Sequence, residues 1–216
     1  MLYILYIGGV KYETKMVKMG NRNSIYISSW INYSKDKYDL ERFKQLKDIS
    51  SEIISEYTDV EVEKVREIIN IEEGYLTPKV DIRGAIIKCN EILMVKESID
   101  GLWSLPGGWA DINLSVSENI IKEAREEAGI DIKPIKIVAI LDKNKYNKPI
   151  SVQSIYKIFI LCDFISGKFE KNIETEESKF FKFDELPNLS TARNTKEQIK
   201  MCFDAFNKEG FETIFD

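Results

Sequence analysis

Histidine is absent from this chain of 216 residues. The absence excludes a Ser-His-Asp triad, a Cys-His pair and any metal centre that depends on imidazole ligands. If the protein is an enzyme, its acid–base chemistry must come from carboxylates, lysine, tyrosine or water on a metal ion.

Cysteine is scarce as well. Cys89, Cys162 and Cys202 are far apart, and no C-x-x-C motif is present. An odd number of separated cysteines does not form a disulfide framework, and no histidine could activate one of them as a nucleophile. We expect reduced thiols in a cytosol and therefore a cytoplasmic protein.

Long apolar runs and an excess of basic residues are also missing. Residues 1–10 are apolar but far fewer than the roughly 20 that span a bilayer, and they lack a basic leader; we expect a buried strand or an overlong start there. With 31 Lys+Arg against 36 Asp+Glu, the net charge is −5. We therefore expect no membrane association, and no nucleic acid as the main partner.

The remaining composition, 44% hydrophobic and 31% charged, is that of a globular domain with a small appendage. Residues 34–77 are predicted to form a helical hairpin, with residues 58–61 as a capping box that opens its second helix. Such a hairpin cannot bury its own apolar faces, so we expect it to pack on the rest of the chain or to form a homodimer. Residues 1–33 lack a helical period and are expected to be an extension of uncertain structure. The apolar stripe of the first helix comprises Leu40, Phe43, Leu46, Ile49, Ile53 and Tyr57.

Residues 78–216 are predicted to form one α/β domain. Strands are expected at 79–89, 91–96, 135–141, 151–164 and 180–183, and a final helix, using Ile199, Cys202, Phe203 and Phe206, at 195–207. A helix over 115–128 has a capping box, Ser115 with Glu118, and ends at Gly129. Strands and helices do not alternate strictly, which indicates a mixed sheet sandwiched by helices.

Three carboxylates share one stripe of the helix at 115–128. At about 100° per residue, Glu123, Glu126 and Glu127 lie together, beside a stripe of small and apolar residues that faces the core. Such a cluster requires a counter-charge, and Mg²⁺ or Mn²⁺ fits oxygen ligands. For the glutamates alone, a solvated acidic face is the simpler interpretation; the Gly-Gly loop before the helix and the Gly-Ile pair after it favour a site.

In this setting the segment resembles the box of Nudix hydrolases, G-x5-E-x7-R-E-U-x-E-E-x-G-U, where U is a bulky aliphatic residue. Leu114 stands at the first glutamate of the box, Lys122 at its arginine, and Ala124 at an aliphatic position. The lead-in Leu-Pro-Gly-Gly-Trp is also similar. The matching residues are Gly108, Glu123, Glu126, Glu127, Gly129 and Ile130.

The resemblance implies an α/β/α sandwich and a pyrophosphohydrolase. Its substrate would be a nucleoside diphosphate linked to another group, of the ADP-ribose or CDP-choline type. Segments 33–36, 108–111 and 193–199 resemble a subgroup of such enzymes with a helical hairpin ahead of the catalytic domain, one of which is a homodimer. In that picture Glu123, Glu126, Glu127 and the Gly107 carbonyl hold Mg²⁺ or Mn²⁺.

Further residues are candidates for substrate binding. Arg83 is predicted either to contact phosphate or to lie at a sheet edge, and Gly108 of the Gly-Gly loop is a further candidate. For Trp103, core packing is favoured over base stacking. Glu176 belongs to an acidic segment that is either a solvated turn or a source of the general base; the base candidates are Glu127, Glu174, Glu176 and Glu177.

The two departures from the box, Leu114 and Lys122, replace residues that hold the metal-binding acids in position. In the family, the first glutamate and the arginine orient the metal-binding acids, and here Glu118 is either a substitute brace for Lys122 or only part of the capping box. Three other functions stay open: RNA end-processing, nucleotide sanitising, and a non-catalytic nucleotide sensor. A sensor joined to a DNA reader is disfavoured, because the three acids are intact and no basic helix-turn-helix is evident.

Overall fold

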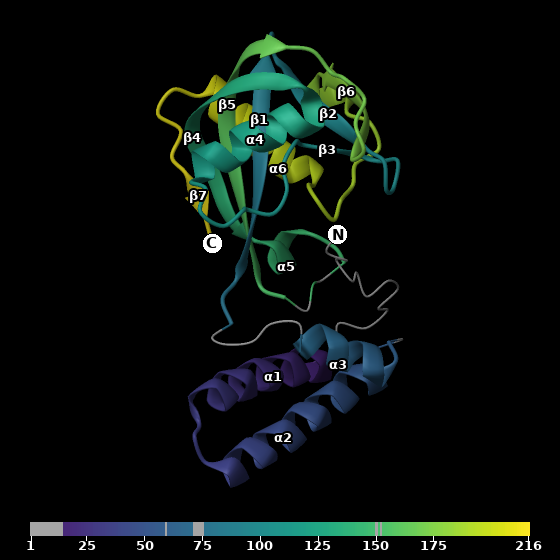
Figure 1. The fold of residues 1–216 in the computed structure, drawn as a ribbon. Coiled ribbons are helices and arrows are strands. Elements are labelled where there is room, and N and C mark those ends of the chain that lie inside the picture. The colour runs from purple at the N-terminus through teal and green to yellow at the C-terminus, as the bar shows by residue number, and fades with distance from the viewer. Residues whose placement is uncertain (1–14, 59, 71–75, 150, 152) are drawn as a thin grey trace. The chain divides into compact units, whose positions relative to one another are not determined.

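The computed structural model describes residues 15–58, 60–70, 76–149, 151 and 153–216 (Figure 1). The chain divides into two compact units, Met1–Thr77 with Pro149–Val152, and Pro78–Lys148 with Gln153–Asp216. No helix among the described residues is long and apolar enough to cross a membrane. The expectation for residues 1–10 falls outside the described residues.

The first unit contains three helices, α1 (Lys15–Tyr33), α2 (Lys37–Glu56) and α3 (Val62–Asn70). Helix α1 corrects the expectation that residues 1–33 lack helical periodicity. Its buried face is made mostly of small residues, Gly20, Ser24 and Ser28 with Ile27, so a search for an apolar stripe does not detect it. A Cβ on Gly20 would lie 3.0 Å from the Ile54 side chain, which shows how closely α1 and α2 approach.

Helix α3 begins later than the sequence suggested. The Thr58 hydroxyl donates to the Ile54 carbonyl of α2, at 2.8 Å, and the helix starts at Val62. The predicted capping box at 58–61 is therefore wrong, because Thr58 closes the end of α2 instead. Val65 and Ile69 of α3 pack with Ile54 in a small buried cluster.

The second unit is built on a mixed sheet, as the sequence predicted, but the sheet has seven strands where five were expected. The strand order is β3-β2-β1-β5-β4-β7, and β6 pairs with β2. Strands β1 and β5 are parallel, whereas β4 and β5 are antiparallel. The elements are β1 (Lys79–Lys88), β2 (Glu91–Glu97), β3 (Trp103–Ser104), α4 (Val116–Ala128), β4 (Ile130–Asp142), α5 (Lys143–Tyr146), β5 (Ile155–Gly167), β6 (Thr175–Phe181), a 3₁₀ turn (Phe183–Glu185), α6 (Lys196–Asn207) and β7 (Ile214–Phe215).

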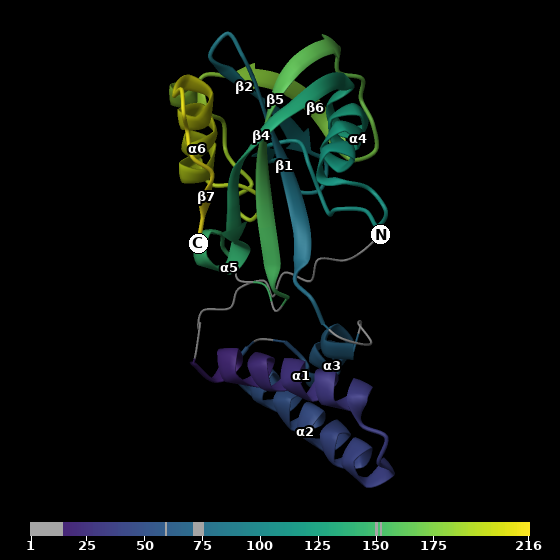
Figure 2. The same ribbon diagram turned by 90° about the vertical axis from the view of Figure 1, so that its left-hand side faces the viewer.

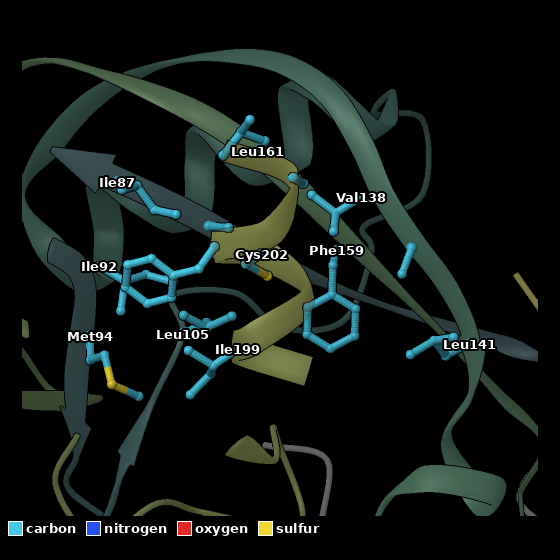
Figure 3. Close-up of a cluster of buried hydrophobic side chains, with 14 residues drawn as sticks. Ile87, Ile92, Met94, Leu105, Val138, Leu141, Phe159, Leu161, Ile199 and Cys202 are labelled. Atoms are coloured by element: carbon cyan, nitrogen blue, oxygen red, sulfur yellow. The ribbon is translucent and has the colours of Figure 1, made fainter. Parts of the chain in front are cut away.

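Helices α4 and α6 cover opposite faces of this sheet (Figure 2). Because side chains alternate along a strand, β1 contributes Ile82 and Ile86 to the core under α4, and Ala85 and Ile87 to the core under α6. Figure 3 shows the second core, where Ile199 and Cys202 of α6 lie among sheet residues that include Phe159. Phe206, predicted to join this core, is 41% exposed, since it lies near the end of α6.

Candidate functional site

The loop after β3 lies against β1, and its backbone allows no side chain at one position. Ile82 N–H donates to the Gly108 carbonyl and Gly84 N–H to the Pro106 carbonyl, both at 2.8 Å. Gly107 has φ of 137°, and a Cβ there would lie 1.9 Å from the Ile82 carbonyl oxygen. Glycine is therefore required at position 107.

Helix α4 places two glutamates against this loop. It begins at the predicted capping box, Ser115 with Glu118, and ends at Gly129 with φ of 65°. Glu127 Oε2 accepts a hydrogen bond from Gly107 N–H at 2.8 Å. One turn earlier, the Glu123 carboxylate oxygens lie 3.4 Å from the position that a Cβ on Gly108 would occupy. Glycines at 107 and 108 thus allow the backbone to approach both carboxylates.

Burial makes these two carboxylates unusual acids. Glu127 is 5% exposed, and desolvation raises its pKa to about 8, against an opposing effect of the Arg83 charge. Desolvation also raises the pKa of Glu123 to about 7, opposed by Arg83 and Lys122. Burial therefore disfavours two ionised carboxylates at this place, and a divalent cation would supply the counter-charge that lets both ionise.

Arg83 is the buried counter-charge of the site. Its Nε and Nη2 donate to the two oxygens of Asp81, at 2.8 and 3.1 Å, and its Nη1 donates to the Leu105 carbonyl at 3.2 Å. Lys157 Nζ donates to Asp81 at 3.0 Å. Burial alone would raise the pKa of Asp81, but Arg83 and Lys157 lower it to about 2.

This network was not found from the sequence. Asp81 and Lys157 were not singled out, although the spacing of Asp81 and Arg83 at i and i+2 puts them on one face of a strand. Glu97, also missed, forms an ion pair with Arg193, with 3.1 Å between Glu97 Oε1 and Arg193 Nε, and raises the pKa of Glu127 by its charge. The signal in the sequence was the pair of charged residues at alternating positions of β1, a strand that is otherwise mostly apolar.

The remaining predicted site residues lie in different surroundings. Arg83 is 4% exposed, and Trp103 packs edge-on against Phe181 at 4.9 Å between ring centroids. Glu176 lies on β6, not in a turn, and pairs with Lys96 at 3.1 Å. Glu126 is turned to solvent, its side chain 56% exposed. Of the acidic segment, Glu174 is the residue whose charge raises the pKa of Glu123.

The donors that meet at the loop are all oxygens. In the described part of the chain, no three Asp, Glu or Cys side chains form a metal site by themselves. Glu123 and Glu127 supply carboxylates, and none of the hydrogen bonds within the described residues ends on the Gly107 carbonyl. Two carboxylates and one carbonyl are the kind of oxygen ligands that a hard divalent cation such as Mg²⁺ or Mn²⁺ prefers.

Comparison with known proteins places this site in a family. Residues 78–202 match the model of the NUDIX domain, and residues 31–69 match that of a UDP-X-like, N-terminal oligomerisation domain. A Bacillus subtilis (strain 168) protein, YjhB, provisionally named an ADP-ribose pyrophosphatase, is 41% identical over 207 residues, which are 96% of this chain and 100% of that protein.

Two solved structures are also similar. A crystal structure of an ADP-ribose pyrophosphatase from Streptococcus suis 89-1591 is 48% identical, covering 65% of this chain and all of that one, with a TM-score of 0.61. A crystal structure of UDP-X diphosphatase is 31% identical, covering 93% of this chain and 98% of that one, also with a TM-score of 0.61. Nudix hydrolases generally use a divalent metal. This chain, with its glutamate-bearing helix against a Gly-Gly loop, belongs to the Nudix hydrolase family of pyrophosphohydrolases.

Proposed function

We propose that this enzyme hydrolyses the pyrophosphate bond of a nucleoside diphosphate linked to another group, of the ADP-ribose or CDP-choline type, with Mg²⁺ or Mn²⁺. The observation that carries the proposal is the hydrogen bond from Gly107 N–H to Glu127, with Glu123 beside Gly108. The names of the similar proteins, ADP-ribose pyrophosphatase and UDP-X diphosphatase, support a diphosphate that links a nucleoside to a second group.

In the proposed mechanism, Glu123, Glu127 and the Gly107 carbonyl hold the metal. When bound, the metal neutralises pyrophosphate charge and lowers the pKa of the attacking water. Gly107 N–H fixes one oxygen of Glu127, and so keeps the other available as a ligand. The charge of Arg83 offsets part of the buried negative charge of Glu127. Among the described residues, Arg83 pairs directly with Asp81 and with neither Glu123 nor Glu127.

A carboxylate must take the proton of the attacking water, and Glu174 is the candidate that we favour among those considered. Its N–H donates to Asn172 Oδ1 at 2.9 Å, and Asn172 Nδ2 in turn donates to the Glu127 carbonyl at 3.3 Å. The loop that carries Glu174 is thereby tied to α4. As water oxygen bonds to one phosphorus, the bridging P–O bond breaks, giving a nucleoside monophosphate and a phosphorylated second product.

A substrate panel tests the proposal. ADP-ribose, CDP-choline, a UDP-linked sugar, NADH and nucleoside triphosphates would be incubated with Mg²⁺ or Mn²⁺, and phosphate measured after coupling to a phosphatase. We expect hydrolysis of at least one diphosphate-linked compound, lost with chelator. Turnover of triphosphates alone, or of capped or triphosphorylated RNA alone, would contradict the proposed substrate class and favour the sanitising or RNA-processing alternatives.

We also propose that the first unit mediates a homodimer. Apolar side chains remain exposed along α1 and α2, among them Tyr26 at 53%, Trp30 at 52%, Leu46 at 39% and Ile49 at 47%. On α1 their spacing extends to Met19 and Tyr33, so they form one helical stripe. Exposed apolar stripes of this kind mark interfaces, and the matching family model describes an oligomerisation domain.

Light scattering on the full chain tests this second proposal. Leu46→Asp with Ile49→Asp should convert a mass of about 50 kDa, twice the monomer value of 25.1 kDa, into a single-chain mass. The control is Asn32→Asp with Gln45→Asp, which adds the same charge at exposed polar positions, one on α1 and one on α2. A wild-type protein that is monomeric at micromolar concentration would contradict the dimer.

A further inference from the structure

Lys122 replaces the arginine of the family box, and it has two acidic partners. Its Nζ lies 2.7 Å from Asp111 Oδ2 and 3.2 Å from Glu126 Oε2. Leu114, at the position of the missing box glutamate, is 38% exposed. Of these two carboxylates, Glu126 belongs to the box, whereas Asp111 is a residue that the box does not specify.

Glu118 is not that carboxylate. Its Oε2 accepts from Ser115 N–H at 2.8 Å, and its own N–H donates to Ser115 Oγ at 3.2 Å. No ion pair between Glu118 and Lys122 is present among the described residues. Of the two roles that the sequence left open for Glu118, the structure shows capping.

Asp111 is held in place from the helix side. Its N–H donates to Asn119 Oδ1 at 2.7 Å, and Asn119 Nδ2 donates to the Leu114 and Ser115 carbonyls, at 3.2 and 3.1 Å. Asn119 is 2% exposed, and Asn113 has φ of 65°, which reverses the chain between Asp111 and the helix. The Asp111 carboxylate is thus anchored near the lysine by a buried amide.

We propose that Asp111 is a positioning residue that takes over the role of the missing box glutamate, by holding the Lys122 ammonium away from the metal-binding acids. This inference rests on the proposed function. Lys122 is the chain neighbour of Glu123 and already pairs with Glu126, one turn further along α4. Without Asp111, the ammonium would be free to turn toward Glu123 and compete there with a divalent cation.

The size of the expected effect follows from exposure. The Lys122 and Asp111 side chains are 40% and 52% exposed, so their pairing contributes little to the stability of the fold. Groups that orient metal ligands nevertheless change metal affinity by roughly 10- to 100-fold when they are removed. We expect the lower end of that range, because solvent screens this pair.

Binding of Mn²⁺ alone to the full chain, followed by the electron paramagnetic resonance signal of free Mn²⁺, tests the proposal. Asp111→Asn should weaken Mn²⁺ binding about tenfold, and Asp111→Glu should keep it within about threefold of wild type. The matched control is Asp131→Asn, which removes a similarly exposed ion pair, with Arg125, at the other end of α4. It should leave Mn²⁺ affinity unchanged.

A double-mutant cycle identifies the route of the effect. In a Lys122→Gln background, Asp111→Asn should cause no further loss of Mn²⁺ affinity, because no ammonium remains to be displaced. Wild-type affinity in Asp111→Asn, or an equal loss in both backgrounds, would overturn the proposal. Normal Mn²⁺ binding by Glu127→Gln would instead contradict the metal site of the proposed function, so the two failures are distinguishable.

Discussion

Two groups of ion pairs lie near Glu123 and Glu127, the proposed metal ligands, and these two groups differ in burial. Asp81, Arg83 and Lys157 form a buried group, with Arg83 4% and Lys157 0% exposed. Asp111, Lys122 and Glu126 form an exposed group. Removing one member of a buried group leaves an uncompensated charge, whereas exposed partners are replaceable at little energetic cost. This contrast explains why the departures from the family box, at 114 and 122, belong to the exposed side.

The largest effect on turnover is expected from changes to Glu123 and Glu127, which lie near both groups of ion pairs. Glu127→Gln and Glu123→Gln should each lower kcat at saturating Mg²⁺ by at least about a thousandfold, roughly 4 kcal/mol in the barrier, because a metal-binding charge is lost. Circular dichroism should show a retained fold. The control is Glu118→Gln, whose amide can still accept from Ser115 N–H. Near-normal turnover in either acid variant would remove the basis of the metal site.

The buried group should be costly to break. Arg83→Met leaves Asp81 with Lys157 alone, and removes the cation that offsets Glu127. We expect the free energy of unfolding, measured in urea, to fall by about 3–5 kcal/mol. Arg125→Met, which breaks a pair whose arginine side chain is 63% exposed, should cost less than about 1 kcal/mol. Equal losses in the two variants would contradict the comparison.

Stability of the metal-free protein should depend on pH through the two acids. The pKa of Glu127 in the fold is about 8, above its ordinary value of 4.5, so the fold favours the protonated form. The stabilisation is complete below the ordinary pKa and is lost as pH rises through the folded value, on the order of a few kcal/mol between pH 5 and 8. Added Mg²⁺ should stabilise the protein more at pH 8 than at pH 5.5.

Thermal unfolding at several pH values, with chelator and with Mg²⁺, measures both effects. Asp81, with a pKa of about 2, is ionised throughout this range and contributes no slope to it. Glu127→Gln is the control and should make the metal-free profile shallower, leaving the contribution of Glu123. A wild-type profile that is already flat from pH 5 to 8 would show that burial does not raise the two pKa values.

The smallest effect is expected on the exposed side. Leu114→Glu restores the family residue, but Lys122 already has a carboxylate partner in Asp111. Turnover should therefore rise no more than a few-fold. A rise above about tenfold, roughly 1.4 kcal/mol, would show that the natural arrangement leaves the acids poorly positioned.

Much of the fold was predictable because its signals are local. The Ser115 and Glu118 capping box and the left-handed Gly129 fix the limits of α4, and these limits determine which glutamates share a face. Helix α1 escaped prediction because its inner face relies on Gly20 and small polar residues, and their close packing depends on α2. Hydrophobic periodicity does not detect a helix that is buried through its smallest side chains.

The candidate site also has parts that could be predicted from the sequence and parts that could not. Helical spacing predicts that Glu123 and Glu127 share one face of α4, and the family resemblance implied that this face meets the Gly-Gly loop. The pairing of Asp111 with Lys122 could not be predicted in this way. It depends on a chain reversal at Asn113 and on the buried amide of Asn119, eight residues after Asp111. Contacts of that kind are fixed by tertiary structure and have no periodic signal in the sequence.

The conformation of Gly107 restricts how this protein can evolve. Every amino-acid change that a single-base substitution makes in a glycine codon adds a Cβ, and at this position a Cβ would lie 1.9 Å from the Ile82 carbonyl oxygen. No other residue can therefore replace Gly107 without a change in the backbone of the loop. Variation that adjusts the enzyme to new substrates has to accumulate elsewhere, on the exposed loops around α4, while the backbone at position 107 stays fixed in every functional descendant.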